Sequence, residues 1–434
     1  MTALGCRLAA GRGSWARAGL LACVCGLGCA DPDDTGTAAV PPPYGQPLPL
    51  PGCAAFDYRD CDVRSPACVD HLVQIASCMR GEETADPSPP VSLVSEAEAR
   101  ELLLGSLSRA PASEPDYFEI VLTQLGLTVP QALQPADSAT RLAQRWAAFY
   151  RRDVGDVVVI DHSGAGAAAP DPVASQALVL HELIHALQDR QRSLDDFART
   201  YQADSDGSLR GSSVIEGEAQ LYAQRFHAAR SGVDVQAVDW PRELASQREA
   251  AEQGLFEEQD LYSASLLRVP YAHGTEYVAR LWAEGGPAQV RELLRAPPRD
   301  MRQILAQLWG DAALAPDLPS IDPLPVGPAD ATLETWSTLG AWGVYLFCRP
   351  KLESAQAAQQ LALAWRGDRL EAFSFGEGQA AGRWSIELAD RAAASSLLAT
   401  IAAVPAFRAR QQDTRLLVLS SSSGEPPAWL DPTH

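Results

Sequence analysis

The spacing of hydrophobic residues along the chain predicts a mostly helical body followed by a tail that contains strands. Helical spacing is found in several segments of the body: 96–108, 139–151, 172–190, 213–230, 277–282 and 288–294. One short run in the body, Asp156–Ile160, is rich in β-branched residues and predicts a strand. The tail has the pattern of two paired strands (369–375 and 382–388), a helix (389–403) and a final strand (415–419). The sequence therefore predicts an α+β fold.

Two of the predicted helices have recognisable ends. Asp171 followed by Pro172 fits an N-cap with proline in the first turn, so we expect a helix from there to about Arg190. Gly232 follows Arg230 and is a typical C-terminal stop for the helix predicted from residue 213. These two helices carry most of the residues that can do chemistry.

The N-terminus has the pattern of an export signal. Three arginines precede an apolar stretch, 18–27, which is too short to remain as a membrane-spanning helix. Small residues before Cys29 resemble a bacterial lipoprotein cleavage site, which would place a lipid anchor on Cys29. Cys23 offers a competing site, and a plain secretory signal is the alternative. Residues 1–29 are thus expected to direct the protein to the cell envelope or out of the cell.

Composition shifts divide the rest of the chain into four parts. Residues 30–52 are rich in proline and form a predicted tether, and residues 53–80 hold a cluster of cysteines. The main body is expected over 91–330 and the strand-containing C-terminal region over 331–434. The body alone is long enough to form a hydrophobic core of its own.

Four cysteines of the clustered segment, Cys53, Cys61, Cys68 and Cys78, suit an exported protein with two disulfides. Three pairings are possible. A structural zinc site is the alternative, although the spacings lack the C-x2-C pairs that such sites favour. Cys348 lies apart from this segment and is expected to be an unpaired core residue.

The charge of the chain excludes one class of partner. Hydrophobic residues make up 46% and charged residues 21%, which is ordinary for a globular protein, but the formal net charge is −20. Such an acidic protein is repelled by phosphate backbones. We therefore expect no nucleic-acid partner.

His181-Glu182-Leu183-Ile184-His185 fits the pattern H-E-x-x-H inside a predicted helix. Residues four apart lie one turn apart on the same face, so His181 and His185 can reach one metal ion. Glu182 then points beside the ion, where it can take a proton from the attacking water as general base. Zinc is the metal that this pattern predicts. An amphipathic helix with two incidental histidines is the alternative.

A catalytic zinc site needs a third protein ligand and one open position. Downstream candidates are Glu216, Glu218, His227 and His273. Glu216 and Glu218 would be about 200° apart on a helix, so only one of them can face the metal and the other is expected to face solvent. Gly217 between them leaves room for a second helix to approach closely.

The segment His181–Asp189, HELIHALQD, resembles a bacterial family of zincin-type metallopeptidases that typically reads HELTHALQDQ followed by E-G-[DE]-A. Here that second motif is Glu216-Gly217-Glu218-Ala219, and the resemblance implies that Glu216 is the third zinc ligand, as in gluzincins. The similarity covers roughly residues 140 to 390 and includes the segments 148–150, 270–274, 285–286, 297–298 and 365–369. Pro287 stands where the family has Trp, and the cysteine segment has no counterpart. The resemblance implies a zincin-like, mostly helical domain with a small β-containing C-terminal part.

Three more residues are candidates for supporting roles. Tyr271 and His273 could stabilise the oxyanion of a tetrahedral intermediate, the alternative being a core tyrosine and a surface histidine. Asp189 lies four residues after His185, where it could orient that histidine or pair with a neighbouring arginine.

These features together predict an exported zinc metallopeptidase that hydrolyses proteins or peptides. The substrate would add itself as a strand along Asp156–Ile160, taken here as an edge strand. Two other functions are compatible with the sequence. One is a non-catalytic envelope protein that keeps zinc for structure or binding, and the other is a lipoprotein adaptor whose cysteine segment is the working part.

Overall fold

A computed structural model of the chain describes residues 53, 61–83, 87–107, 116–129, 139–140, 143, 148–162, 171–201, 204–310, 321, 331–375, 379–404 and 406–430. The predicted signal (1–29, with Cys29) and the whole of the predicted tether (30–52) lie outside these residues. Among the helices described, none is both long and apolar enough to span a bilayer. The mixed α+β class predicted from the sequence is confirmed.

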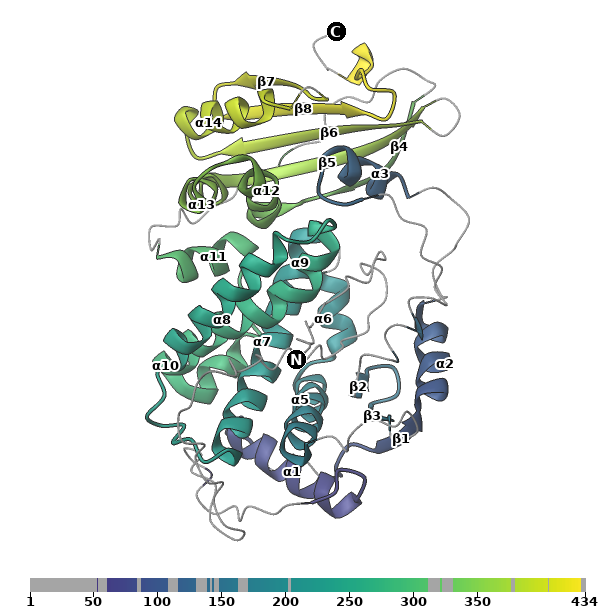
Figure 1. The fold of residues 1–434 in the computed structure, drawn as a ribbon, viewed down its shortest axis with the longest axis vertical. Helices are drawn as coiled ribbons and strands as arrows, with labels where there is room; N and C mark the ends of the chain where they lie inside the picture. Colours follow the sequence, from purple (N-terminus) through teal and green to yellow (C-terminus); the bar gives the residue numbers. More distant parts are fainter. Residues whose placement is uncertain are drawn as a thin grey trace, which may run out of the picture.

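The middle of the molecule is a body of packed helices (Figure 1). Its elements are α5 (Pro172–Gln191), α6 (Leu194–Tyr201), α7 (Ser205–Arg230), α8 (Trp240–Leu255), α9 (Leu261–Val269), the π-helical turn η2 (Pro270–Gly274), α10 (Thr275–Glu292) and α11 (Met301–Trp309). Helix α7 packs most extensively against α5 and η2. Helix α1 (Pro66–Met79) packs against α5 at the lower end of the view in Figure 1.

A small sheet lies beside the helical body, next to α2 (Glu96–Leu107). It consists of β1 (Val91–Ser95), β2 (Ala148–Arg151) and β3 (Asp156–Asp161) in the order β1-β3-β2. Strand β3 pairs in parallel with β1 and antiparallel with β2. The strand predicted over 156–160 is therefore present, but the prediction that it forms an edge of the sheet is wrong.

The C-terminal region is a five-stranded antiparallel sheet (Figure 1). Its strands are β4 (Ala331–Ser337), β5 (Trp365–Phe375), β6 (Gln379–Leu388), β7 (Arg408–Gln412) and β8 (Arg415–Ser421), in the order β4-β5-β6-β8-β7. The helical elements of this region are α12 (Gly340–Cys348), η3 (Arg349–Lys351), α13 (Ala355–Ala364), α14 (Arg391–Ala402) and η4 (Ala428–Leu430). Helix α3 (Tyr117–Gln124) comes from the N-terminal half and packs on this sheet, where Gly382 leaves room for Val121.

Several element boundaries differ from the predicted ones. Residues 148–151 pair with β3 as strand β2 and do not continue a helix from 139. Helix α7 begins at Ser205, well before residue 213, because the side chain of Asp204 accepts a hydrogen bond from the Gly207 backbone N–H and caps it. The predicted helices 277–282 and 288–294 form one element, α10, which is kinked at Gly286 with φ of 65°.

One large hydrophobic core joins the helical body to the C-terminal sheet. Every residue of α12 is buried, and this helix lies between the two parts (Figure 1). Cys348 at its end is a free, buried thiol, as predicted. The clustered cysteines pair as Cys53–Cys78 and Cys61–Cys68, which leaves no thiolates for a four-cysteine zinc site.

Candidate metal centre

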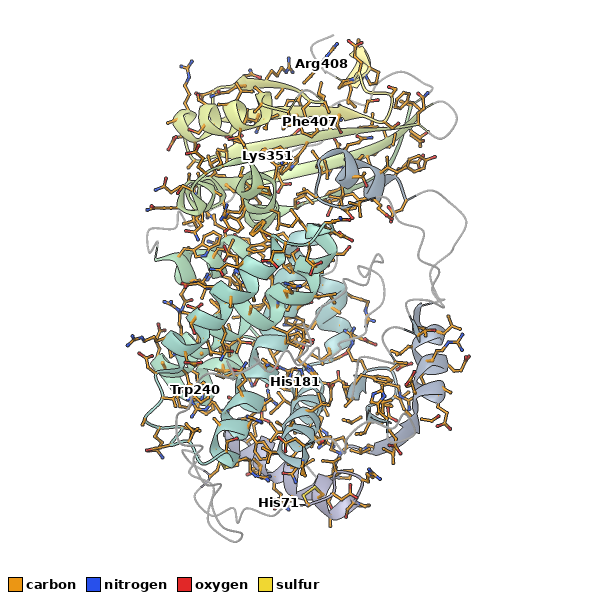
Figure 2. All side chains as sticks on the ribbon, viewed as in Figure 1. His71, His181, Trp240, Lys351, Phe407 and Arg408 are labelled. Carbon is orange, nitrogen blue, oxygen red and sulfur yellow. A yellow bond between two sulfur atoms is a disulfide. The ribbon has the colours of Figure 1, made fainter. Side chains whose placement is uncertain are left out.

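The two histidines of the H-E-x-x-H pattern lie on one buried face of α5. Asp171 caps this helix through a hydrogen bond from the Val173 backbone N–H, as predicted. His181 and His185 are both fully buried, and their Nε2 atoms are 3.0 Å apart. Figure 2 shows His181 inside the helical body. The helical spacing thus brings two imidazole nitrogens to one point, as the sequence predicts.

Glu216 reaches the same point from the neighbouring helix, α7. Its Oε2 lies 3.3 Å from Nε2 of His181 and 3.5 Å from Nε2 of His185. Tetrahedral bonds of 2.0–2.1 Å would place ligand atoms about 3.3–3.4 Å apart, so these distances suit one shared ion. Among the described residues, His181, His185 and Glu216 are the group of histidines, cysteines and acids that could hold a metal ion. We refer to these three residues as the metal group.

The other candidate ligands lie elsewhere. Glu218 is buried and contacts Arg80 and Gln188, so the prediction that it faces solvent is wrong. His227 is in the last turn of α7, well beyond Glu216, and is not part of the group. His273 is buried too, but its Nε2 lies 3.5 Å from Glu252 and its ring meets Trp342 edge-on.

Charges inside the group are strongly coupled. Burial opposes a charge on His185, but the carboxylate of Glu216 outweighs it and raises the pKa of His185 to about 9. In the same way, burial would raise the pKa of Glu216, but the two histidines lower it to about 2. Burial lowers the pKa of His181, which therefore stays neutral. The positive charge on His185 thus neutralises the carboxylate of Glu216, and a bound metal cation would neutralise it in the same way.

Glu182 is the one carboxylate beside this group that lacks a partner. It is fully buried, and neither of its oxygens accepts a hydrogen bond from the residues that the structure describes. Burial raises the pKa of Glu182 to about 8, while His185 and the nearby backbone N–H of Tyr150 oppose the shift. A buried carboxyl without hydrogen-bond donors lowers the stability of the fold. Its position next to His181, His185 and Glu216 therefore indicates that Glu182 contacts a ligand bound there.

His185 is held by a residue that the sequence reasoning missed. Its Nδ1 lies 2.8 Å from Oε1 of Gln188, one turn further along α5. Asp189, the residue proposed for this role, accepts hydrogen bonds from the Tyr150 hydroxyl and the Leu194 backbone N–H. Neither His185 nor a neighbouring arginine is among these hydrogen-bond partners of Asp189. The signal for Gln188 was its position in the HALQD segment, three residues after His185.

Tyr271 lies against the metal group because two helical elements approach closely. Its ring stacks on His181 with centroids 6.1 Å apart and an interplanar angle of 18°. A Cβ atom on Gly217 would lie 2.5 Å from the backbone of Gly274, and one on Gly274 would lie 2.3 Å from Ser213 O. The predicted close approach at Gly217 is thus confirmed, and the approaching element is η2. Within η2, Tyr271 faces the metal group and His273 does not.

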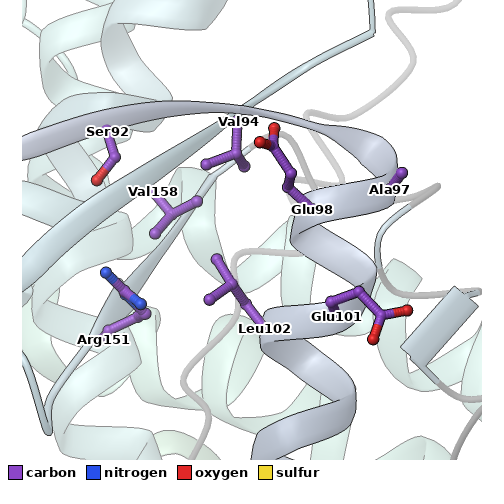
Figure 3. Close-up of a pocket in the computed structure, with 8 residues that line it drawn as sticks. All are labelled: Ser92, Val94, Ala97, Glu98, Glu101, Leu102, Arg151 and Val158. Carbon is purple, nitrogen blue, oxygen red and sulfur yellow. The ribbon is translucent and has the colours of Figure 1, made fainter.

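A separate hollow of about 680 Å³ lies between the small sheet and α2 (Figure 3). It is lined by apolar and by polar or charged residues in equal number: Val94, Ala97, Leu102, Val158, Ser92, Glu98, Glu101 and Arg151. No member of the metal group lines it. The hollow therefore adds nothing to the chemistry of that group.

Comparison of the chain with protein-family models, with curated proteins and with solved structures finds no match. The resemblance to zincin-type metallopeptidases therefore stays a prediction, and the geometry of the site is what supports a function.

Proposed function

We propose that this protein is a zinc-dependent peptidase with a zincin-like body, in which His181, His185 and Glu216 hold the zinc. Two imidazole nitrogens and one carboxylate oxygen are a donor set that zinc accepts, and three protein ligands leave a fourth position free. When bound there, zinc would act as a Lewis acid on a peptide carbonyl and make water acidic enough to attack it at neutral pH. The remaining steps belong to residues of the chain.

Glu182 carries this proposal, because it is a buried carboxylate whose oxygens lack a regular hydrogen-bond partner in the described part of the chain, and it lies beside His181, His185 and Glu216. As general base it takes a proton from the attacking water and then passes it to the nitrogen of the leaving amine. Tyr271, stacked on His181, is the residue to stabilise the carbonyl oxygen as it gains negative charge. We assign this role to Tyr271 alone, since His273 is turned towards Glu252.

The substrate is best placed along β2. This strand pairs with β3 on one side only among the described residues, and it packs against α5. Tyr150 of β2 lies close enough to Glu182 to affect its pKa. An extended peptide that pairs with β2 would therefore pass the metal group, with backbone hydrogen bonds for affinity.

Export and a lipid anchor at Cys29 remain part of the proposal. Two disulfides within residues 53–78 suit an oxidising compartment. Such a protein would act in the cell envelope or outside the cell on a protein or peptide substrate.

A second function is favoured by the burial of the site. His181, Glu182 and His185 are fully buried and Glu216 is 3% exposed. A closed site of this kind would suit an envelope protein that keeps a metal ion for structure or binding, without catalysis.

One experiment separates the two functions. The purified full-length protein, supplied with zinc, is assayed for metal content and for hydrolysis of casein and a peptide library. Glu182→Gln should keep its zinc but lose turnover by about 10²-fold or more. Glu371→Gln is the control, because Glu371 is buried in a pair with Arg383 in the C-terminal sheet, and it should keep full turnover. Full activity in Glu182→Gln would contradict the mechanism, and zinc without any hydrolysis in the wild type would favour the second function.

A further inference from the structure

A chain of buried polar contacts leads from His185 to the disulfide-linked segment. Nδ1 of His185 contacts Gln188, whose Nε2 donates to Oε2 of Glu218 at 2.8 Å. Oε1 of Glu218 accepts a hydrogen bond of 2.9 Å from Nε of Arg80. Arg80 caps the C-terminal end of α1, two residues after Cys78. His185, Gln188, Glu218 and Arg80 are all buried, so water does not compete for these contacts.

The chain of contacts fixes which nitrogen of His185 is free for a metal. Nε2 of Gln188 donates both to Ile215 O (3.0 Å) and to Glu218, so this amide must turn its oxygen towards His185. An oxygen can only accept, and Nδ1 of His185 must therefore carry the proton. The lone pair is then on Nε2, the atom that faces His181 and Glu216.

Arg80 holds the far end of this chain in place. Besides Glu218, it donates to Glu82 at 3.0 Å and to Gln191 at 2.7 Å, so its guanidinium joins α1 to both α5 and α7. Without Arg80, Glu218 would be a buried carboxylate with only the amide of Gln188 as a partner, which would favour its rotation or protonation. The position of Gln188 thus depends on a residue of the disulfide-linked segment.

We propose that Gln188, Glu218 and Arg80 are positioning residues that fix the tautomer and orientation of His185 for metal binding. The disulfide-linked segment, residues 53–80, is then a working part of the metal site through Arg80. This inference rests on the proposed function, since it assumes that the His181, His185 and Glu216 group binds zinc. Partners of this kind typically change metal affinity 10- to 100-fold when removed.

The test measures zinc affinity by competition with a chelator in the full-length protein. Gln188→Met keeps the length of the side chain and should weaken zinc binding by about 10- to 100-fold. Gln124→Met is the control, because Gln124 is a half-buried glutamine of α3 that donates to Ala380 O and accepts from the Ser420 hydroxyl, away from both the metal group and residues 53–80. It should keep the wild-type affinity. Thermal unfolding of the metal-free variants shows that each is folded.

Arg80 is tested in the same assay. Arg80→Met should weaken zinc binding in the same direction as Gln188→Met, by up to about 10-fold, and Arg80→Lys should restore part of the loss because it keeps a charge for Glu218. The double variant with Gln188→Met should be no weaker than Gln188→Met alone, because both act through His185. Wild-type affinity in Arg80→Met would overturn the role of the disulfide-linked segment, and wild-type affinity in Gln188→Met would overturn the whole chain.

A metal-free measurement separates this inference from the proposed function. In protein labelled with ¹⁵N at its seven histidines, NMR at a pH high enough to leave the imidazoles neutral should show neutral His185 with its proton on Nδ1, and this preference should disappear in Gln188→Met. If the wild type binds no zinc, the proposed function fails, but this tautomer result still decides whether the chain orients His185. An unchanged tautomer in Gln188→Met would contradict the inference whether or not zinc binds.

Discussion

Two buried carboxylates in this protein have opposite surroundings. Asp368, in strand β5, accepts four hydrogen bonds, from the backbone N–H groups of Leu339 and Gly340 and from the indole N–H groups of Trp365 and Trp384. Glu182, in helix α5, accepts none from the described residues. Burying a carboxylate is tolerable when donors replace its water, and Asp368 meets that condition.

The difference distinguishes a structural carboxylate from one that is available for chemistry. Asp368 joins the start of α12 to two strands of the sheet, so its four contacts hold the C-terminal region together. Glu182 has no such set of donors: only the backbone N–H of Tyr150 lies near it among the described residues, and it lies beside two histidines and a glutamate that converge on one point. A buried group without partners is a cost to stability, and such costs cluster where a protein binds or reacts.

Replacing each carboxylate by its amide should change stability in different directions. Asp368→Asn puts an NH₂ group against N–H donors and should lower the free energy of unfolding by about 2–4 kcal/mol. Glu182→Gln removes a buried acid that has no partner and should leave the metal-free protein unchanged or up to about 1 kcal/mol more stable. Denaturant unfolding of the metal-free proteins measures both. A large loss in Glu182→Gln would mean that Glu182, like Asp368, has a structural partner.

The two candidate residues of η2 provide a second contrast. Tyr271→Phe should lower kcat by about 10²-fold with zinc content unchanged, because it removes a hydroxyl that can donate to the developing oxyanion. His273→Gln should keep kcat and instead lower thermal stability, because His273 packs against Trp342 and lies beside Glu252. Steady-state kinetics and thermal unfolding of both variants check this. Equal losses of kcat would show that His273 also serves the reaction.

The smallest expected effect concerns Cys348, whose thiol should not react with an alkylating reagent in the native protein. Burial raises the pKa of its thiol to about 12, and the reactive form is the thiolate. Because the pKa lies far above neutrality, alkylation of the native protein at pH 8 should leave Cys348 unmodified, and unfolding should expose it. Peptide mass spectrometry detects the modification. Rapid labelling of the native protein would show that the core around α12 is open.

Local patterns allowed part of the fold to be predicted. The cap at Asp171 and the spacing of His181 and His185 depend only on neighbouring residues, so α5 and its two histidines followed from the sequence. Glu216 followed from a resemblance to a known motif, and the structure places it within 3.3 Å of His181. In each case, the signal lay within a few residues of the feature that it predicted.

The features that could not be predicted from the sequence depend on contacts between distant segments. Residues 148–151 have a helical pattern, but pairing with β3 turns them into a strand at the edge of the small sheet. Glu218 was expected in solvent because it lies about 200° around the helix from Glu216, yet it is buried in a pair with Arg80, which lies 138 positions earlier. Gln188 was overlooked because its role appears only when α7 packs beside α5.

Whether the protein holds zinc at His181, His185 and Glu216 is tested by the metal content of the purified full-length protein, determined by mass spectrometry. We expect about one zinc per chain in the wild type, and little or none in His185→Ala, which removes one of three protein ligands. The Gln124→Met variant should keep its zinc. A folded wild-type protein that holds no zinc even after zinc is supplied would contradict the account, because Glu182 would then have no metal site to serve.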